Sequence, residues 1–248
     1  MRAVKSKVKL VAYTKDAEKL IAESARLCYG TDEEVKELFK RNSKVDSKRM
    51  IKILMDMEHL SPIEHPSYSF LLTGVSRALT HQLVRHRLAS YSQRSQRYVK
   101  HKNFNFIIPE TIESIGKAKE FRKDMESVRE LYEKWGRVLE EELGLEGEAN
   151  NQDARYVLPN ACETKIITTM NARELLHFFK ERLCNRAQWE IRGVAEKMLD
   201  LAYPTVPNLF QYAGPNCYSE GKCKQGKKSC GKLEQVVQHF ENKKNRFK

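Results

Sequence analysis

The sequence predicts an α+β fold, in which a central, mostly antiparallel sheet is flanked by helices, including one long amphipathic helix. Two kinds of segment indicate this. Residues 7–14, 67–76 and 162–170 have the alternation or the β-branched and aromatic content of strands. Residues 117–143 instead space their apolar side chains by three and four, which is the period of a helix. The 248 residues suffice to bury a sizeable core.

The first elements are a short strand and two helices. Residues 7–14 alternate apolar and polar side chains, as a strand with one buried face does. Residues 16–28 and 46–60 follow the spacing of helices. The second helix runs into a loop at 59–65, because Pro62 prevents a regular helix from continuing.

The middle of the chain predicts a strand at 67–76 and a helix at 77–86. The chain beyond this helix is expected to be extended. A period of two would then point Gln93, Ser95 and Arg97 in one direction, toward the wall of a pocket.

The second half predicts a long helix, a short helix, a strand and two more helices. Their ranges are 117–143, 148–157, 162–170, 172–183 and 191–202. The apolar stripe of the long helix indicates core or subunit packing. Asn171 is expected to cap the helix that follows it, and Glu174 stands where a capping box places an acidic residue.

Positive charge is concentrated in two segments. The net charge is +12, and residues 76–102 hold seven Lys and Arg, three His and no carboxylate. Residues 221–248 hold nine Lys and Arg against two Glu, which leaves the rest nearly neutral. Cations without a local counter-ion repel one another, so an anionic partner would stabilise the first segment. A solvated basic helix end is the alternative, and so is a nucleic-acid-binding surface that stacks bases on Tyr91 and Tyr98.

The last part of the chain differs in composition. We expect a main domain at 1–215 and a basic, cysteine-containing appendage at 216–248. The spacing of its cysteines is wider than zinc sites favour, so loose thiols are expected there. Single buried thiols are expected earlier in the chain. The two sets are Cys217, Cys223 and Cys230, and Cys28, Cys162 and Cys184.

Other motifs exclude several classes of protein. Residues 221–227 resemble a phosphate-binding loop, but Lys228 replaces the required Ser or Thr. No stretch approaches the ~20 apolar residues of a membrane span, and residues 1–9 lack the apolar run of a signal peptide. A cytoplasmic protein is therefore expected.

The loop at 59–65 holds two histidines and one glutamate behind a rigid proline, which suits a functional site. A histidine at a helix C-terminus is the structural alternative. His59 and His65 stand six residues apart, which is not a metal-binding spacing. A metal-dependent nucleotide hydrolase that uses this loop and His86 remains a further possibility.

Arg-His-Arg at 85–87 is followed after seven residues by Ser95-x-Arg97. This pattern resembles the signature of the flavin-dependent thymidylate synthase family. Further matches cover most of residues 20–215. They are His-x-Ser-Pro-x-Glu-His at 59–65, Asn-x-Arg at 171–173 and Ala-Gln-Trp-Glu-Ile at 187–191.

The resemblance implies reductive methylation of dUMP to dTMP without a cysteine nucleophile. FAD would be the cofactor, methylenetetrahydrofolate the one-carbon donor and NADPH the reductant. It also implies a homotetramer with shared pockets and no metal. Arg182 matches the arginine implied to activate the uracil ring, so it is the candidate catalytic residue.

The other implied roles are binding contacts. Those to dUMP are Gln82, Arg85, Gln93, Ser95, Arg97, Arg155 and Arg182. Those to FAD are His59, Ser61, Glu64, Arg85, His86, Arg87, Gln93, Asn171, Arg173, His177 and Arg186. The sequence departs from the family at Gln93, where many relatives carry Glu, and at Arg186, where some carry His.

Overall fold

The computed structural model describes residues 1–28, 30–40 and 46–247. These residues divide into two compact units that interleave along the chain. Unit 1 comprises Met1–Lys7, Leu71–Arg85 and Tyr91–Ile167, and unit 2 comprises Val8–Phe70, His86–Ser90 and Thr168–Lys248.

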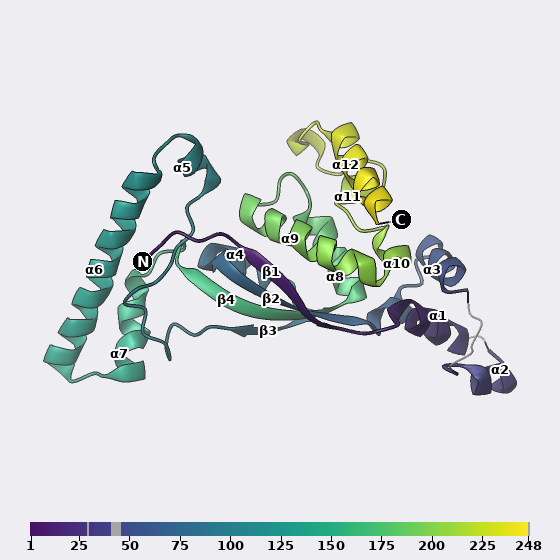
Figure 1. Cartoon of the computed structure of the whole chain (residues 1–248), viewed down its shortest axis with the longest axis horizontal. Helices are drawn as coiled ribbons and strands as arrows, with labels where there is room; N and C mark the ends of the chain where they lie inside the picture. The colour runs from purple at the N-terminus through teal and green to yellow at the C-terminus, as the bar shows by residue number, and fades with distance from the viewer. Residues whose placement is uncertain (29, 41–45, 248) are drawn as a thin grey trace. The chain divides into compact units, whose positions relative to one another are not determined.

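The described residues form a four-stranded antiparallel sheet with the order β1-β2-β4-β3 (Figure 1). The strands are β1 (Lys7–Tyr13), β2 (Ser67–Ser76), β3 (Ala89–Gln93) and β4 (Glu163–Asn171). A hydrogen bond of 2.8 Å joins the hydroxyls of Ser69 and Thr169 across β2 and β4. Side chains along β4 alternate between buried and more exposed positions, as period two requires. The predicted α+β fold is confirmed.

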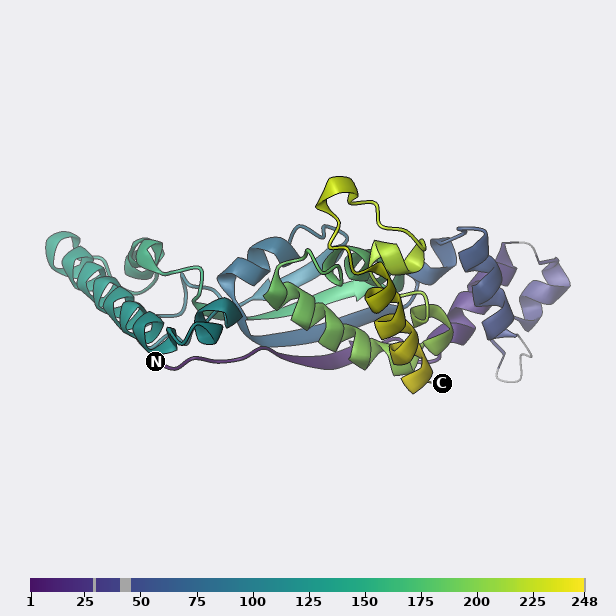
Figure 2. The same ribbon diagram turned by 90° about the horizontal axis from the view of Figure 1, so that it is seen from above.

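Unit 1 contains the predicted long helix. Its helices are α4 (Arg77–Leu83), α5 (Glu110–Ser114), α6 (Ala118–Leu143), α7 (Gly147–Ala154) and the short 3₁₀ helix η2 (Arg155–Val157). Helices α6 and α7 lie side by side (Figures 1 and 2). The Asn150 Nδ2 atom joins them by donating to the Gly136 carbonyl at 2.6 Å. The stripe of α6 is only partly covered, since Leu131 and Trp135 keep 44% and 43% of their surface exposed.

Unit 2 contains the remaining helices. Its α-helices are α1 (Ala17–Leu27), α2 (Asp32–Glu37), α3 (Ser47–Asp56), α8 (Ala172–Arg182), α9 (Trp189–Ala202), α10 (Pro207–Phe210), α11 (Asn216–Ser219) and α12 (Leu233–Arg246). Its 3₁₀ helices are η1 (Ser61–Glu64), η3 (Tyr203–Thr205) and η4 (Gly226–Lys228). Helix α8 packs beside α9, and α1 beside α3 (Figure 2). Phe178 and Phe179 of α8 are fully buried, which gives the unit an aromatic core.

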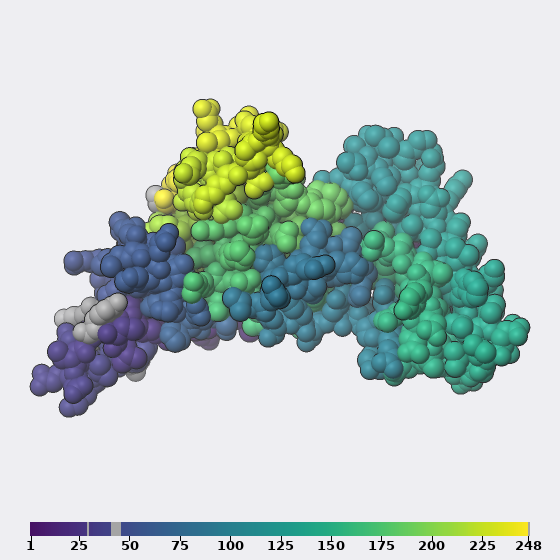
Figure 3. Space-filling model, turned by 180° about the vertical axis from the view of Figure 1, so that it is seen from behind, coloured from purple at the N-terminus to yellow at the C-terminus, as the bar shows by residue number. Residues whose placement is uncertain are grey.

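The C-terminal segment makes specific contacts within unit 2. Figure 3 shows it, in yellow, lying on the green part of the same unit. The Lys243 Nζ atom binds the Asp200 Oδ1 atom at 2.6 Å. The rings of Tyr203 and Phe247 stack with centroids 4.7 Å apart. The division of the chain at residue 215 stays a prediction.

Two local predictions were wrong. Strand β3 ends at Gln93, and the Ser95 hydroxyl then accepts the N–H groups of Arg97 at 3.0 Å and Tyr98 at 3.2 Å. A short polar side chain has closed a turn, so the period of two does not continue beyond Gln93.

The other error concerns a thiol. Cys28 is exposed rather than buried, at the C-terminal end of α1. In the described part of the chain, no helix is both long and apolar enough to cross a membrane.

Candidate functional site

The most structured candidate group lies in unit 2 and is centred on His86. Its imidazole is buried, and the residue keeps only 6% of its surface exposed. The Arg182 Nε–H donates to its Nε2 atom at 3.0 Å. Its Nδ1 atom lies 3.3 Å from the Glu174 Oε1 atom. Because the lone pair of Nε2 accepts a hydrogen bond, the proton of the neutral ring lies on Nδ1 and faces the carboxylate.

Electrostatics keep this imidazole neutral. Burial, followed by the charges of Arg182 and His177, lowers the pKa of His86 from 6.5 to about 4. Burial raises the pKa of Glu174, and the charge of His177 opposes that rise. A neutral His86 can therefore hold the guanidinium of Arg182 without repelling it. The arrangement runs from Glu174 through His86 to Arg182 and fixes the direction of the arginine.

Fold elements supply each member of this group. Arg182 is the last residue of α8, and Glu174 lies in its first turn. The Asn171 side chain caps the same helix by accepting the N–H of Glu174 at 2.8 Å. Glu174 was expected as a capping-box residue, but its carboxylate faces His86 instead. The predicted N-cap is confirmed, whereas the role of Glu174 was missed because the local motif offered a sufficient explanation.

A second group of predicted residues meets at the start of α8. The N–H of Ala172 donates to the Pro66 carbonyl at 2.8 Å, which brings the 59–65 loop to this helix end. The Glu64 Oε1 atom then binds the Arg173 Nη1 atom at 2.5 Å, and both side chains are about half exposed. Three predicted flavin contacts are thus neighbours at the N-terminus of α8, namely Glu64, Asn171 and Arg173. Three others, His59, Ser61 and His177, are exposed in the same unit.

The predicted nucleotide contacts of unit 1 lie around the end of β3 and around α7. The Gln93 Nε2 atom donates to the hydroxyls of Thr80 at 3.0 Å and Thr164 at 3.3 Å. Its amide is therefore engaged by α4 and β4. Neither threonine carried a sequence signal for this contact.

Arg97 is tied to α7. Its Nη2 atom lies 2.5 Å from the Glu148 Oε1 atom, and its carbonyl accepts the Asn151 Nδ2–H at 3.1 Å. Arg155 follows α7 directly, and its Nε–H donates to the Gln152 carbonyl at 3.1 Å. The structure therefore brings the 95–97 segment to the helix that precedes Arg155, although the two are far apart in sequence.

Three other predicted contacts lie in or just after α4. Arg85 and Arg87 are exposed, and Gln82 lies near the end of α4 with a 3.5 Å bond to the Ala78 carbonyl. Arg186 is exposed, and its Nη1 atom binds the Gln225 Oε1 atom of the C-terminal segment at 2.6 Å. The contact with Gln225 had no signal in the sequence.

The cysteines of the C-terminal segment gather near the end of α8. Cys184, Cys217 and Cys223 line a cavity of about 230 Å³ that Arg182 and Arg186 also line. The Asn185 Nδ2 atom contacts the Cys230 Sγ atom at 3.7 Å. All six cysteines are free thiols. Within residues 1–28, 30–40 and 46–247, no group of three His, Cys, Asp or Glu side chains could hold a metal ion as it stands.

The pKa of the Cys217 thiol is raised by its surroundings. Burial, followed by the charges of Cys184, Cys223 and Cys230, raises the pKa of Cys217. The tail thiols are free, as expected, and Cys217 and Cys223 lie near the loop after Arg182.

Comparison with known proteins gives a consistent result. The family model of the thymidylate synthase complementing protein matches residues 9–208. A flavin-dependent thymidylate synthase from Clostridium tetani is 49% identical over 241 residues, covering 93% of this chain and 95% of that protein. One from Geobacter sulfurreducens is 44% identical over 237 residues, covering 94% and 97%.

A solved structure shares the fold. It is the UMP/dUMP methylase PolB from Streptomyces cacaoi, crystallised with 5-Br dUMP. The alignment has a TM-score of 0.70 and 23% identity, and it covers 85% of this chain and 95% of that one.

Proposed function

Because the chain belongs to the flavin-dependent thymidylate synthases and is therefore a dUMP methyltransferase, we propose that it forms dTMP reductively with FAD as its cofactor. Methylenetetrahydrofolate is the one-carbon donor and NADPH the reductant in this proposal, and no cysteine attacks the uracil ring. The observation that carries the mechanism is the arrangement of Glu174, His86 and Arg182, because it presents a fixed guanidinium beside a neutral imidazole.

The residues of unit 2 fit a flavin nucleotide. The N-terminus of α8, an 11-residue helix, offers partial positive charge next to Arg173, and this end of the helix favours phosphate oxygens. Arg87 is exposed and free to rotate toward a phosphate, while Glu64 can position Arg173. We therefore assign FAD binding to the 59–65 loop, to 85–87 and to the start of α8. Bound FAD would supply hydride to the reaction.

Arg182 is the proposed catalytic residue. The uracil ring becomes nucleophilic at C5 when negative charge develops on its O and N edge, as happens when N3 loses its proton. A guanidinium held at that edge stabilises this charge, and its donors are already oriented before the substrate binds. His86 and Glu174 are positioning residues, since they touch Arg182 rather than the substrate.

The substrate phosphate is assigned to the arginines around α7. Arg97 and Arg155 present guanidinium groups suited to a phosphate dianion, and Ser95 adds a hydroxyl. Arg97 forms an ion pair with Glu148. When the substrate binds, Arg97 would exchange this carboxylate for the phosphate. Gln93 replaces the glutamate of many relatives, and its amide bonds to Thr80 and Thr164 support a role in shaping the pocket.

The chemistry of the cysteines supports a mechanism without a thiol nucleophile. Burial raises the pKa of Cys162 to about 11, so this side chain is a protonated thiol near neutral pH. Cys184 stands nearest to Arg182 in sequence and lines the same cavity. Its replacement by serine is therefore the direct test of cysteine independence.

We propose a homotetramer in which each pocket draws residues from several subunits. Exposed apolar side chains on α6 and after α7 support subunit packing, since Leu131, Trp135 and Tyr156 keep 44%, 43% and 84% of their surface exposed. Light scattering of the purified enzyme should give the mass of four chains. Free thiols fit a reducing compartment, and we assign the enzyme to the cytoplasm.

The experiment that tests the proposal is a spectrum and an assay on one preparation. Purified enzyme should show the absorbance of bound flavin, and NADPH should bleach it in the absence of oxygen. Addition of dUMP and methylenetetrahydrofolate should then yield dTMP. A colourless protein that forms no dTMP when FAD is supplied would refute the proposed cofactor and mechanism.

A further inference from the structure

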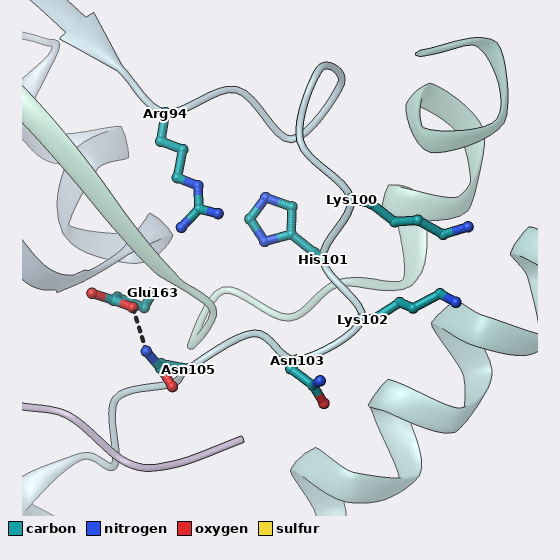
Figure 4. Close-up of a pocket in the computed structure, with 7 residues that line it drawn as sticks. All are labelled: Arg94, Lys100, His101, Lys102, Asn103, Asn105 and Glu163. Atoms are coloured by element: carbon teal, nitrogen blue, oxygen red, sulfur yellow. Dashed lines mark hydrogen bonds between the residues drawn. The ribbon is translucent and has the colours of Figure 1, made fainter. Parts of the chain in front are cut away.

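A cavity in unit 1 lies outside every contact assigned above. Its volume is about 330 Å³, and it is lined by the 94–105 segment and the first residue of β4 (Figure 4). The lining residues are Arg94, Lys100, His101, Lys102, Asn103, Asn105 and Glu163. The proposed reaction uses none of them. Ser95 and Arg97, which are proposed substrate contacts, belong to the same segment.

The charges in this cavity favour an anion. Arg94, Lys100 and Lys102 contribute three positive charges, and none of them forms an ion pair with another described residue. The one carboxylate, Glu163, is engaged by the fold, because its oxygens accept the Gly74 N–H at 3.1 Å and the Asn105 Nδ2–H at 2.9 Å. An anion bound here would relieve the repulsion among the three cations.

His101 adds a more specific requirement. The residue is 94% buried, and its backbone N–H donates to the Tyr132 hydroxyl at 3.1 Å, which fixes its position. Figure 4 shows its imidazole projecting toward Arg94. Its Nε2 atom is buried and has no hydrogen-bond partner among the described residues. A buried polar atom left in this state destabilises the protein, and a ligand with a shareable proton would offset this cost.

The surroundings of His101 keep its ring neutral when the cavity is empty. Burial, followed by the charge of Arg94, lowers the pKa of His101, and Arg77 acts in the same direction. A hydrogen bond with the Ser95 backbone and the charge of Glu163 oppose this. An anion placed between Arg94 and the imidazole would add negative charge beside the ring and raise its pKa again.

We propose that this cavity binds a phosphate monoester, with one proton shared between a phosphate oxygen and the His101 imidazole. Arg94 binds the remaining oxygens from the side that the imidazole faces. The side chains of Lys100 and Lys102 point away from the ring in Figure 4, and they would turn toward the bound anion. A phosphate monoester fits because its second pKa is about 6, so it accepts or gives up this proton near neutral pH. A phosphodiester has no such proton, which disfavours a nucleic-acid backbone. Binding therefore takes up about one proton and strengthens as the pH falls from about 8 to about 6.

Calorimetry with inorganic phosphate as the probe tests this on the full-length enzyme. Saturating dUMP is present throughout, so that the proposed substrate contacts are occupied. Phosphate should bind the wild-type enzyme at least about tenfold more tightly than sulfate, which stays a dianion without a proton in this pH range. Its affinity should rise toward lower pH.

Variants locate the binding. Lys100→Ala and Lys102→Ala change exposed side chains and should each weaken phosphate binding by about tenfold. His101→Gln should abolish the preference over sulfate. Lys119→Ala, an exposed lysine on α6, is the matched control and should bind as the wild type does. Equal affinity for phosphate and sulfate, or wild-type binding by both lysine variants, would overturn the inference.

A second measurement identifies the natural source of the phosphate and rests on the proposed reaction. If the 2′-phosphate of NADPH occupies the cavity, Lys100→Ala should raise KM for NADPH and leave KM for NADH unchanged. If a free phosphate monoester occupies it, neither KM should change while phosphate binding still weakens. Arg155→Ala should impair the use of dUMP but keep phosphate binding in this cavity. Failure of the cavity inference and failure of the proposed function therefore give different results.

Discussion

His86→Leu removes the atom that accepts the hydrogen bond of Arg182. In the structure, the Arg182 Nε–H reaches the imidazole Nε2 atom at 3.0 Å, and the residue that carries this ring is 94% buried. Leucine fills most of the same space against Phe178, so the packing of α8 should persist. What changes is the guanidinium, which loses its fixed direction.

The size of the effect follows from the charged donor. A hydrogen bond that involves a charged group contributes about 1.5–3 kcal/mol. If this free energy holds Arg182 in the geometry of the transition state, its loss lowers kcat by about 10- to 150-fold. KM for dUMP should change much less, because the phosphate contacts are untouched. His86→Gln should retain part of the rate, since an amide oxygen can accept the same N–H.

Steady-state formation of dTMP measures both parameters. His81→Leu, which alters an exposed histidine of α4, is the control and should keep wild-type kinetics. Bound flavin and thermal unfolding should be recorded for each variant, so that loss of cofactor is separated from loss of catalysis. A kcat for His86→Leu within about twofold of the wild type would show that Arg182 does not depend on this histidine.

Three further predictions concern stability, substrate binding and the thiol. The pKa of His86 is about 4 in the folded protein against 6.5 for the free side chain, so the unfolded chain binds more protons between these pH values. The free energy of unfolding should therefore fall by up to about 3 kcal/mol as the pH drops from 6.5 to 4. Denaturant titrations should show a smaller fall for His86→Leu. Arg155→Ala should raise KM for dUMP by about tenfold with little change in kcat, and an unchanged KM would remove this residue from the phosphate site. Cys184→Ser should keep dTMP formation within about twofold of the wild type, whereas loss of turnover with flavin still bound would argue for a thiol in the reaction.

The regular elements of the fold could be predicted from the sequence, because periodicity and β-branched content reflect burial directly. Strand β2 has the predicted bounds, and α6 and α8 each differ from theirs by one residue at one end. These segments are long or strongly patterned, so local and tertiary preferences agree. The N-cap of α8 at Asn171 could also be predicted, because this one side chain accepts a hydrogen bond from an N–H group of the first turn.

The contacts that organise the site could not be predicted in the same way. Glu174 serves His86 across 88 positions of sequence, and its local pattern suggested only a helix cap. Strand β3 ends at Gln93 because the Ser95 hydroxyl closes a turn. Such turns compete with an extended backbone, and the sequence gives no strong signal for them. The family motifs named the residues, whereas the partners that hold them emerged from the tertiary structure.

The cysteines of the C-terminal segment show the same limit. Their spacing along the chain favoured separate thiols, but Cys217 and Cys223 share a cavity with Cys184, which lies more than 30 positions earlier. Spacing rules describe ligands or thiols on one local segment. Groups assembled from distant segments fall outside those rules.

The central claim is that a guanidinium fixed by His86 polarises the uracil ring, and Arg182→Ala tests it most directly. Bound flavin per chain and the rate of dTMP formation should be measured on the same sample. The account predicts wild-type flavin content and a rate at least about 100-fold lower. A rate close to that of the wild type, with flavin bound, would contradict it.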